Sequence, residues 1–591
     1  MRIGNILAAS AALCLIQHVA SAQNLDPTVV VNKAYDGKLV QVHKPSFEMA
    51  VPDSVARFDL DFDYLLSDRP YKGADGFNPY ELTMKPASVV QEPMTFYLNA
   101  GAGYTMHPTL DLVWSPLRSK AFKLDVYAIH GSYVGDYRSF SPAAPEAGKT
   151  LVVDSWRESG GDRACWNGYD LMSRTGIDGR YEAASLSTGF DVSYYGLASR
   201  DLWKWRMYDA LDVKVGVTSK PGNSSYFKYD VQAEYRFAED KLKYDTAVND
   251  YLGEHVFALD AVLGHVLGEG HQIMSDVNMD LAAYSHFADW PSSVVSQLSV
   301  TPHYVFVKGP WTVDAGLKLA KVMRSETSGS LFGAREQIVY PDIKATFAAI
   351  PDAMRIYAIA GGGNKINTYA SLLERNHHLD TSYGLAGQGL MDVTVERVSV
   401  SLGLEGRIGS IFSYDLRTGY VNYGNALLDA VSLVSGHAVG SVQYLPAVGY
   451  TPYQKYFATL DWRLNSESFR FDGVMTYTHA WGVNDVAALF APAALTGDVS
   501  LEYNWNRRIY AGIDCQFSTA RNGFVADVPN ADLLDAKIPG YADLGVYFEY
   551  SCNRVLSVWA RGGNLLGMTI QRNPLFAEKG ASATVGICLN L

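Results

Sequence analysis

Apolar and polar residues alternate one by one over long stretches of this chain. In residues 228–237, the even positions carry charges and amides, including Asp230, Glu234 and Arg236, while the odd positions are aromatic or aliphatic. Successive side chains of a β-strand point to opposite faces, so each such stretch has one polar and one apolar face. The pattern therefore predicts strands that separate an apolar medium from a polar one.

The same alternation ends the chain. Its last strand is predicted over 581–591, with apolar residues on one face at Val585, Ile587, Leu589 and Leu591. A first strand over 96–104 alternates in the same way. We expect these two strands to pair, because an open sheet edge in hydrocarbon would leave backbone groups without hydrogen bonds.

Two architectures place an apolar face on every strand: a sandwich of two sheets, and a closed barrel in a membrane. After residue 22 the chain has no run of 18 apolar residues, so no membrane helix is expected. Short turns are predicted at ten places, and longer connections between them, such as 131–167, 363–384, 424–453 and 519–540. This asymmetry between short turns and long loops favours the barrel.

The ten turns set the size of the barrel. They lie near 116–120, 183–185, 221–224, 267–270, 308–310, 351–353, 408–411, 465–468, 506–507 and 553–554. Ten turns join twenty strands, and an opening and a closing strand bring the number to about 22. The predicted fold is all-β, a transmembrane antiparallel β-barrel over 94–591 whose two ends lie on the short-turn, periplasmic side.

The N-terminus has the features of a secretory signal. A basic residue, an apolar stretch and an Ala-Ser-Ala site predict cleavage between Ala22 and Gln23. Residues 1–22 are then the signal peptide, and 23–93 a short periplasmic extension. The four later cysteines, whose disulfide state the sequence leaves open, are too few for a disulfide scaffold: Cys165, Cys515, Cys552 and Cys588.

The polar faces of the predicted strands carry charges of both signs. The net charge of the chain is −13, which argues against a nucleic-acid partner. The charges expected to face the lumen include Lys214, Asp230, Glu234, Arg236, Arg417, Arg470 and Asp472. Since no ring of one sign is visible, their expected role is ion pairing and solvation of the interior, and no ion selectivity follows.

Aromatic clusters, such as Tyr194-Tyr195 and 203–208, lie near predicted strand ends. Amphipathic rings favour the boundary between membrane and water, so we interpret these clusters as an interfacial girdle; stacking on a ligand is the alternative.

The sequence offers little sign of catalysis. The motifs of serine hydrolases, zinc proteases and P-loop proteins are absent. His377, His378 and Asp380 are metal-ligand residue types, but adjacent residues rarely reach one ion, and a solvated loop is the expected reading. We predict no enzyme activity, no catalytic residues, no cofactor and no metal site.

Several segments of the chain resemble a known family. Residues 97–135, including Ala100–Gly103, Pro116-Leu117 and His130, resemble the first hairpins of TonB-dependent-receptor-like barrels of the plugless kind. Residues 28–45 and 58–72 are similar to the periplasmic lead-in of that group. The resemblance implies an outer-membrane barrel of 22 strands in a Gram-negative bacterium.

The chain departs from the pattern of a true receptor, which carries a folded plug before its barrel. Only residues 23–93 precede the first strand here, and the last residue, Leu591, is not aromatic. Thr28, Val29, Val30 and Val31 form a stretch similar to a TonB box, and also read as an ordinary β segment.

Two functional hypotheses follow. The first is transport of a solute or polymer across the outer membrane, with a partner or the N-terminal segment closing the lumen. The second is a non-conducting scaffold that anchors lipoproteins of an export or envelope-assembly complex. Both imply contact with outer-membrane lipids and a periplasmic or lipoprotein partner, and the first allows TonB as a partner.

Overall fold

The computed structural model describes most of the chain from residue 95 onward. The described ranges are 95–104, 107–138, 140–142, 156–158, 165–201, 204–220, 227–244, 249–285, 293–324, 337–351, 353–379, 391–435, 442–482, 492–527, 532–572 and 576–591. The predicted cleavage at Ala22 and Gln23, the extension 23–93 and the TonB-box-like residues 28–31 lie outside these ranges.

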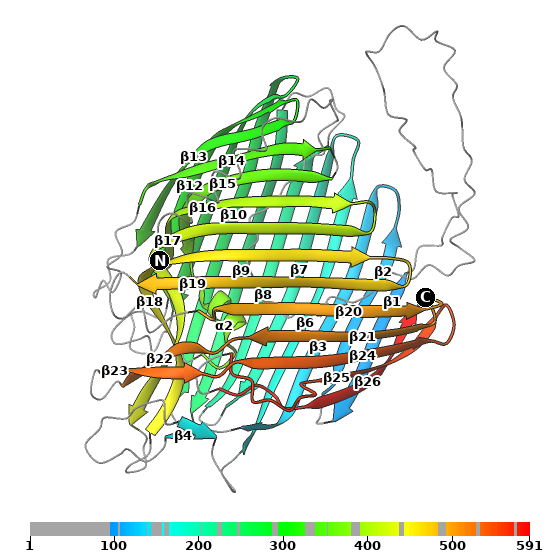
Figure 1. The fold of residues 1–591 in the computed structure, drawn as a ribbon, viewed down its shortest axis with the longest axis vertical. Coiled ribbons are helices and arrows are strands. Elements are labelled where there is room, and N and C mark those ends of the chain that lie inside the picture. The colour runs from blue at the N-terminus through cyan, green and yellow to red at the C-terminus, as the bar shows by residue number, and fades with distance from the viewer. Residues whose placement is uncertain are drawn as a thin grey trace, which may run out of the picture.

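Within the described residues, 22 strands form one closed antiparallel barrel, as predicted (Figure 1). The first half of the wall comprises β1 (Phe96–Tyr104), β2 (Thr109–Arg118), β3 (Phe122–Arg138), β6 (Cys165–Glu182), β7 (Leu186–Arg200), β8 (Lys204–Ser219), β9 (Phe227–Tyr244), β10 (Asn249–Gly268), β11 (His271–Ser285), β12 (Ser293–Lys308) and β13 (Trp311–Arg324). The second half comprises β14 (Val339–Ile350), β15 (Met354–Ile366), β16 (Val393–Ile408), β17 (Phe412–Ser435), β18 (Val442–Asn465), β19 (Phe469–Gly482), β20 (Leu495–Trp505), β21 (Ile509–Ser518), β24 (Tyr541–Ser551), β25 (Leu556–Gly563) and β26 (Ser582–Asn590).

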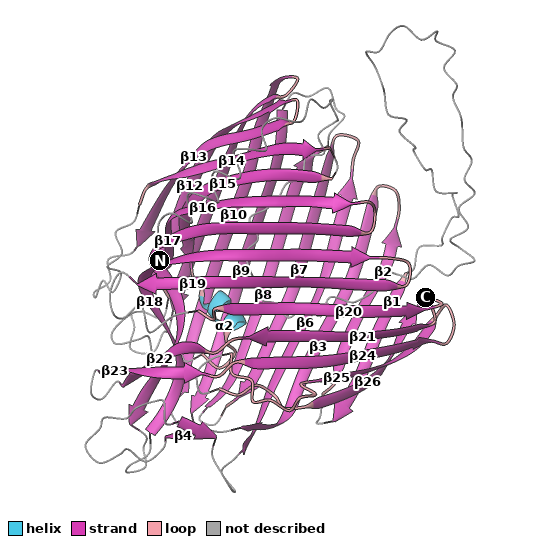
Figure 2. Ribbon diagram, viewed as in Figure 1, coloured by secondary structure: helices cyan, strands magenta, loops and turns pink. Residues whose placement is uncertain are grey.

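A few shorter elements lie in the connections. Strands β4 (Phe140–Pro142) and β5 (Trp156–Glu158) pair with each other, and β22 (Arg521–Asp527) pairs with β23 (Asp532–Ile538). Helix α2 (Tyr369–Arg375) is the cyan element inside the barrel in Figure 2. Among the described residues, no helix has the length and apolar character needed to cross a membrane.

Nine of the ten predicted short turns join neighbouring strands at one end of the barrel, and the tenth, 221–224, lies outside the described residues. One of them joins β20 to β21, where Asn506 and Arg507 both adopt positive φ (51° and 55°) and the Arg508 amide donates to the Trp505 carbonyl (3.1 Å). Two consecutive positive-φ residues match the twist of a hairpin. Both ends of the barrel meet at this end too, since the Thr95 amide donates to the carbonyl of Leu591 (2.7 Å).

The opposite end differs from prediction in its loops. The long connection predicted over 424–453 is wrong, because β17 continues to Ser435 and β18 begins at Val442. Their apolar and small residues pair as strand well past the rest of the wall. The connection predicted over 363–384 begins later, after Ile366, and the one over 131–167 begins after Arg138.

Strands β1 and β26 close the barrel in register, with Leu98 opposite Leu589 and Ala100 opposite Ile587. Trp559 of β25 lies across this seam, and its indole Nε1 donates to the side-chain oxygen of Asn99 (2.6 Å). A Cβ placed on Gly101 would lie 2.5 Å from the Trp559 ring. Gly101 therefore leaves space for the ring that packs over the closure.

The outer face of the wall is apolar and exposed. On β26, Val585 is 65% exposed and Ile587 42% exposed, whereas Cys588 on the inner face is fully buried. The same contrast repeats around the wall, where exposed aliphatic and aromatic side chains include Phe190, Leu211, Tyr235, Leu402 and Leu460. Such a continuous apolar surface is typical of a wall that contacts lipid.

Among the described residues, Cys515, Cys552 and Cys588 are free thiols.

Candidate functional site

The connection between β15 and β16 turns back into the barrel. We call its residues 367–379 the inner segment; they contain α2. The Thr368 side chain caps the helix by accepting from the Ser371 amide (3.2 Å), and the Asn376 amide donates to the Leu372 carbonyl at the other end (3.0 Å). A threonine cap stabilises a helix by about 1 kcal/mol, which helps so short a helix to form.

The apolar face of α2 is buried against two opposite sides of the barrel. Tyr369, Ala370, Leu372 and Leu373 form one cluster with side chains of the wall, which are Leu197 of β7, Tyr208 and Ala210 of β8, Ala238 of β9, Leu252 of β10, Ala282 and Tyr284 of β11, and Val448 and Tyr450 of β18. Strands β8 and β18 lie roughly half the circumference apart. The inner segment therefore spans the lumen.

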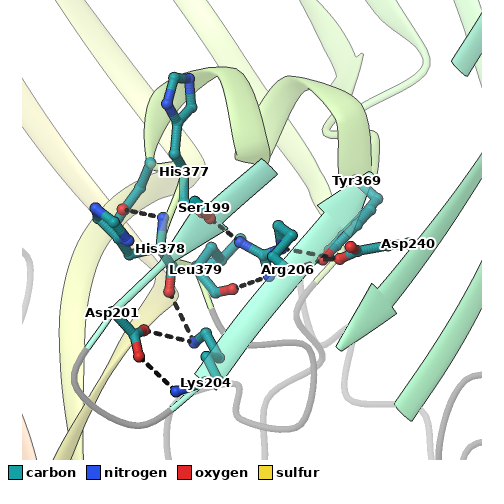
Figure 3. Close-up of polar contacts among 10 residues, drawn as sticks. Ser199, Asp201, Lys204, Arg206, Asp240, Tyr369, His377, His378 and Leu379 are labelled. Atoms are coloured by element: carbon teal, nitrogen blue, oxygen red, sulfur yellow. Dashed lines mark hydrogen bonds and ion pairs between the residues drawn. The ribbon is translucent and has the colours of Figure 1, made fainter. Parts of the chain in front are cut away.

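A buried arginine of the wall holds the inner segment from below (Figure 3). Arg206 Nε donates to the Asp240 carboxylate (3.0 Å), and both side chains are almost completely buried. The same guanidinium donates to the Tyr369 hydroxyl oxygen (3.1 Å), to the His377 carbonyl (2.5 Å) and to the Leu379 carbonyl. Tyr369 also donates to Asp240. One ion pair of the wall thus fixes both ends of the inner segment.

A second cation lies beside the first. Lys204 Nζ donates to the His378 carbonyl (2.8 Å) and lies 3.5 Å from the Asp201 carboxylate. Ser199 Oγ donates to the His377 carbonyl (3.3 Å). These wall groups donate hydrogen bonds to backbone carbonyls that lie outside any helix or strand. An irregular segment can be buried only if its carbonyls are hydrogen-bonded in this way.

Two further contacts fix α2 itself. Arg375 pairs with Asp429 of β17 through two bonds, from Nε (2.5 Å) and from the terminal nitrogen (2.7 Å). Glu254 of β10, whose side chain is buried, accepts from the Ala370 amide (3.3 Å). Because the helix is tied to β10 on one side and β17 on the other, it cannot leave the lumen without breaking hydrogen bonds on both walls.

The connection between β25 and β26 supports the inner segment at its far end. Phe576 of this connection stacks on the His378 ring, with 5.8 Å between ring centroids and an angle of 17°. Within the connection, Arg572 pairs with Glu578 (2.6 Å), and Lys579 Nζ lies 3.2 Å from His107 Nε2. The two connections therefore meet through one aromatic contact.

The histidines at this contact have opposite electrostatic surroundings. Burial lowers the pKa of His378 to about 4, so its ring is neutral near pH 7. For His377, burial opposes protonation, but the Asp170 carboxylate 2.8 Å from Nδ1 prevails and raises the pKa. The predicted solvated loop is thus wrong for both residues, which lie half-buried in the barrel.

No metal site is apparent among the described residues, in which no three His, Cys, Asp or Glu side chains are grouped suitably for an ion. Asp380 lies outside the described ranges.

The predicted lumen charges of β8 and β9 lie on the same strand faces as Arg206 and Asp240. Lys214 pairs with Glu234 (3.0 Å), and Arg236 pairs with the fully buried Asp212 (2.5 Å). Asp230 accepts from the Thr218 hydroxyl (3.0 Å).

The remaining predicted lumen charges lie on β17 and β19. Arg470 pairs with Asp472 (2.6 Å). Arg417 has a different neighbour: its guanidinium carbon lies 5.6 Å from the ring centroid of Phe457. Most of the predicted lumen charges therefore form ion pairs, as expected, whereas Arg417 lies beside an aromatic ring.

Sequence reasoning missed the residues that hold the inner segment. Asp240 and Glu254 sit on the inner faces of predicted strands, like many exposed charges, and nothing local marks them as buried. A signal was present for α2, since Thr368 precedes Tyr-Ala-Ser-Leu-Leu-Glu-Arg, a capped stretch with helical apolar spacing.

The girdle interpretation is wrong for part of the aromatic clusters. Tyr194 is exposed on the outer face and Trp205 with it, whereas Tyr208 is buried in the interior cluster and Tyr195 packs against that cluster. Alternation sends neighbouring aromatic residues to opposite sides of the wall.

Comparison with known proteins identifies solved structures that share the fold of this chain. The chain matches no protein-family model and no curated protein. Among solved structures, it is similar to the FrpB iron transporter from Neisseria meningitidis (11% identity, TM-score 0.57, 84% of this chain and 81% of that one). It is also similar to the copper transporter OprC (12%, 0.58, 84% and 80%) and to the ferric citrate transporter FecA (11%, 0.56, 84% and 78%). At these identities the likeness establishes a shared barrel fold.

Proposed function

We propose that this protein transports a solute across the outer membrane of a Gram-negative bacterium, and that the inner segment is the gate of its lumen. The observation that carries the proposal is a closed barrel with an apolar outer face whose interior is crossed by a segment of the same chain. Three similar structures are named as transporters of iron, copper and ferric citrate.

The attachment of the inner segment supports a gate. Its contacts are side-chain hydrogen bonds, ion pairs and a small apolar cluster, and it forms no strand pairing with the wall. Side-chain contacts can break and re-form without opening the barrel, whose strands are joined by backbone hydrogen bonds.

We propose that the short-turn end is closed separately. The first strand begins there, at Phe96, next to the last residue, Leu591. Either the extension 23–93 or a periplasmic or lipoprotein partner would close this end, and residues 28–31 would allow coupling to TonB by strand addition. The barrel is then of the plugless kind.

The alternative is a non-conducting scaffold that anchors lipoproteins. A crossed lumen is also expected of such a scaffold, because a barrel of this size would otherwise leak. The two functions differ in whether the inner segment moves.

The experiment is to lock the inner segment with a cleavable cross-link. In a background with the native cysteines replaced by alanine, Arg375→Cys and Asp429→Cys are joined by a short disulfide-containing thiol reagent. The matched control joins Lys214→Cys to Glu234→Cys, another ion pair of the lumen that lies entirely within the wall. Conductance is recorded in planar bilayers, with deletion of 23–93 to open the other end.

A transporter is expected to show channel openings that the 375–429 cross-link abolishes and a reductant restores, with no effect of the 214–234 cross-link. Steady silence before and after reduction, together with stoichiometric recovery of a lipoprotein in a mild-detergent pulldown, would favour the scaffold.

A further inference from the structure

Two cations inside the lumen have aromatic rings as neighbours in place of carboxylates. Lys455 Nζ lies 5.4 Å from the ring centroid of Tyr423 and 6.0 Å from that of Phe457, and Arg417 lies over the other side of this set, 5.6 Å from Phe457. Tyr453 stacks on Tyr423, with centroids 5.0 Å apart and an angle of 22°. We call these five residues of β17 and β18 the aromatic–cation stripe.

The stripe faces the interior. Its neighbours along the strands, Leu416, Tyr456 and Leu460, are exposed on the outer face, and alternation sends the stripe residues to the other side. The inner faces of β17 and β18 thus carry aromatic rings and positive charges side by side.

The stripe lies on the short-turn side of the contacts that the inner segment makes with β17 and β18. Arg375 of α2 pairs with Asp429, six residues before the stripe on β17 when the strand is followed towards the short turns, and Tyr450 of β18 packs with α2. Tyr453 follows Tyr450 by three residues. From Asp429 to Arg417 the strand rises about 40 Å, at roughly 3.3 Å per residue, so the stripe leads from the gate towards the short-turn end.

The charges of the stripe are not neutralised like other charges of the lumen. Lys214, Arg236 and Arg470 each lie within 4.0 Å of a carboxylate oxygen. Within the described residues, Arg417 and Lys455 have no such carboxylate. On β17, Asp415 accepts from the Tyr357 hydroxyl instead (2.7 Å). Glu396 of β16 is the acid whose charge acts on Lys455, but among the described residues it forms no ion pair with it.

A cation over a ring keeps its hydrogen-bond donors available to a third group, because the ring takes none of them in conventional bonds. Arg417 is exposed to the lumen and Lys455 half-exposed, so both donors can reach a solute. Rings beside them offer flat apolar faces for stacking.

Resting on the transport role proposed above, we infer that the aromatic–cation stripe is a binding track for organic anions that carry a planar ring. The charge of the solute is met by Arg417 and Lys455, and its ring by Tyr423, Tyr453 and Phe457. A solute that passes the gate therefore reaches this site next on its way to the short-turn end.

The test measures binding, not transport, so that it stands apart from the gating experiment. Purified barrel in detergent is titrated calorimetrically with three probes: 2-naphthoate, which has ring and charge; 2-naphthamide, which has the ring alone; and acetate, which has the charge alone. The expected result is that 2-naphthoate binds at least tenfold more tightly than either of the others.

The variants are Arg417→Gln with Lys455→Gln, which removes both charges, and Tyr423→Leu, which removes one ring. A hydrogen bond to a charged group contributes about 1.5–3 kcal/mol, so the double variant should weaken 2-naphthoate binding by about tenfold or more. The matched control is Lys214→Gln, a lumen cation paired with Glu234, and should leave binding within twofold of the unmodified protein. Heat-modifiable gel mobility verifies that each variant is folded.

Equal binding of the three probes would overturn the inference, as would equal losses in the double variant and in the Lys214→Gln control. Selective binding by a barrel that never conducts would support the stripe and refute the transport role. Conductance through the gate without selective binding would do the reverse.

Discussion

On the β8–β9 wall of the lumen, Arg206 and Asp240 face each other, and both side chains are buried beneath the inner segment. On the β17–β18 wall, Arg417 and Lys455 lie over aromatic rings and open onto the lumen. Both pairs of residues occupy the polar faces of alternating strands. The difference lies in what covers them: a segment of the same chain on one wall, and the lumen on the other.

The comparison shows how one barrel uses the same residue types for two purposes. A buried ion pair is costly to break, because the charge that remains is not solvated by water. An exposed cation over a ring contributes little to stability and remains free to bind. The first wall is thus suited to holding a gate, and the second to receiving a solute.

The largest expected effect is that of Arg206→Ala on the inner segment. Removing one partner of a buried ion pair costs about 3–5 kcal/mol, because Asp240 is left buried and charged. The measurement is the rate of maleimide labelling of Ala370→Cys, a buried position of α2, in the cysteine-free background. Labelling through local opening should accelerate by at least a hundredfold.

Arg417→Ala is the matched control on the other wall, and its labelling rate should stay within about threefold, as for an exposed charge. If the two arginines change the rate equally, the distinction between the walls is wrong.

The second effect in size is that of Leu372→Ala, which removes a fully buried side chain from the cluster that crosses the lumen. Truncation of a buried leucine costs about 2–5 kcal/mol, and a cluster confined to one short helix should give a value in the lower half. The same labelling rate reports it. Leu402→Ala, on the exposed outer face, should leave the rate unchanged; acceleration there would mean that the assay reports loosening of the whole barrel.

The fold could be predicted from the sequence, but the residues that hold the inner segment could not. Alternation and turn chemistry predicted the closed barrel, its 22 strands and the meeting of β1 with β26 because these depend on local pattern and on the need to pair every edge. The burial of Asp240 and Glu254 depends on a segment more than a hundred residues away in the chain that folds onto them. No local pattern distinguishes such a residue from Glu234, which lies on the same face and is only half-buried.

The third effect concerns the start of α2. Thr368→Ala removes the cap of the helix, which is expected to cost about 1 kcal/mol and to accelerate labelling of Ala370→Cys about fivefold. Thr368→Ser keeps the hydroxyl oxygen that accepts from Ser371 and should behave like the unmodified protein. Equal acceleration by both substitutions would mean that the threonine methyl group, and not the cap, is what matters.

The smallest effect expected is a pH dependence of the gate, because two histidines oppose each other. The pKa of His378 is lowered to about 4 by burial, so the stability that its neutral ring provides is present above the unfolded pKa and is lost as the pH falls from about 6.5 towards 4. The pKa of His377 is raised, so its pairing with Asp170 is fully present below the unfolded pKa and weakens as the pH rises through the folded value. Because maleimide reacts with the thiolate and slows as the pH falls, labelling of Ala370→Cys is divided at each pH by that of an exposed cysteine. This ratio should rise between pH 7 and 5 in His377→Gln, where only the His378 response remains. In His378→Gln it should fall over the same interval. Parallel profiles in the two variants would show that neither ring controls how the inner segment is held.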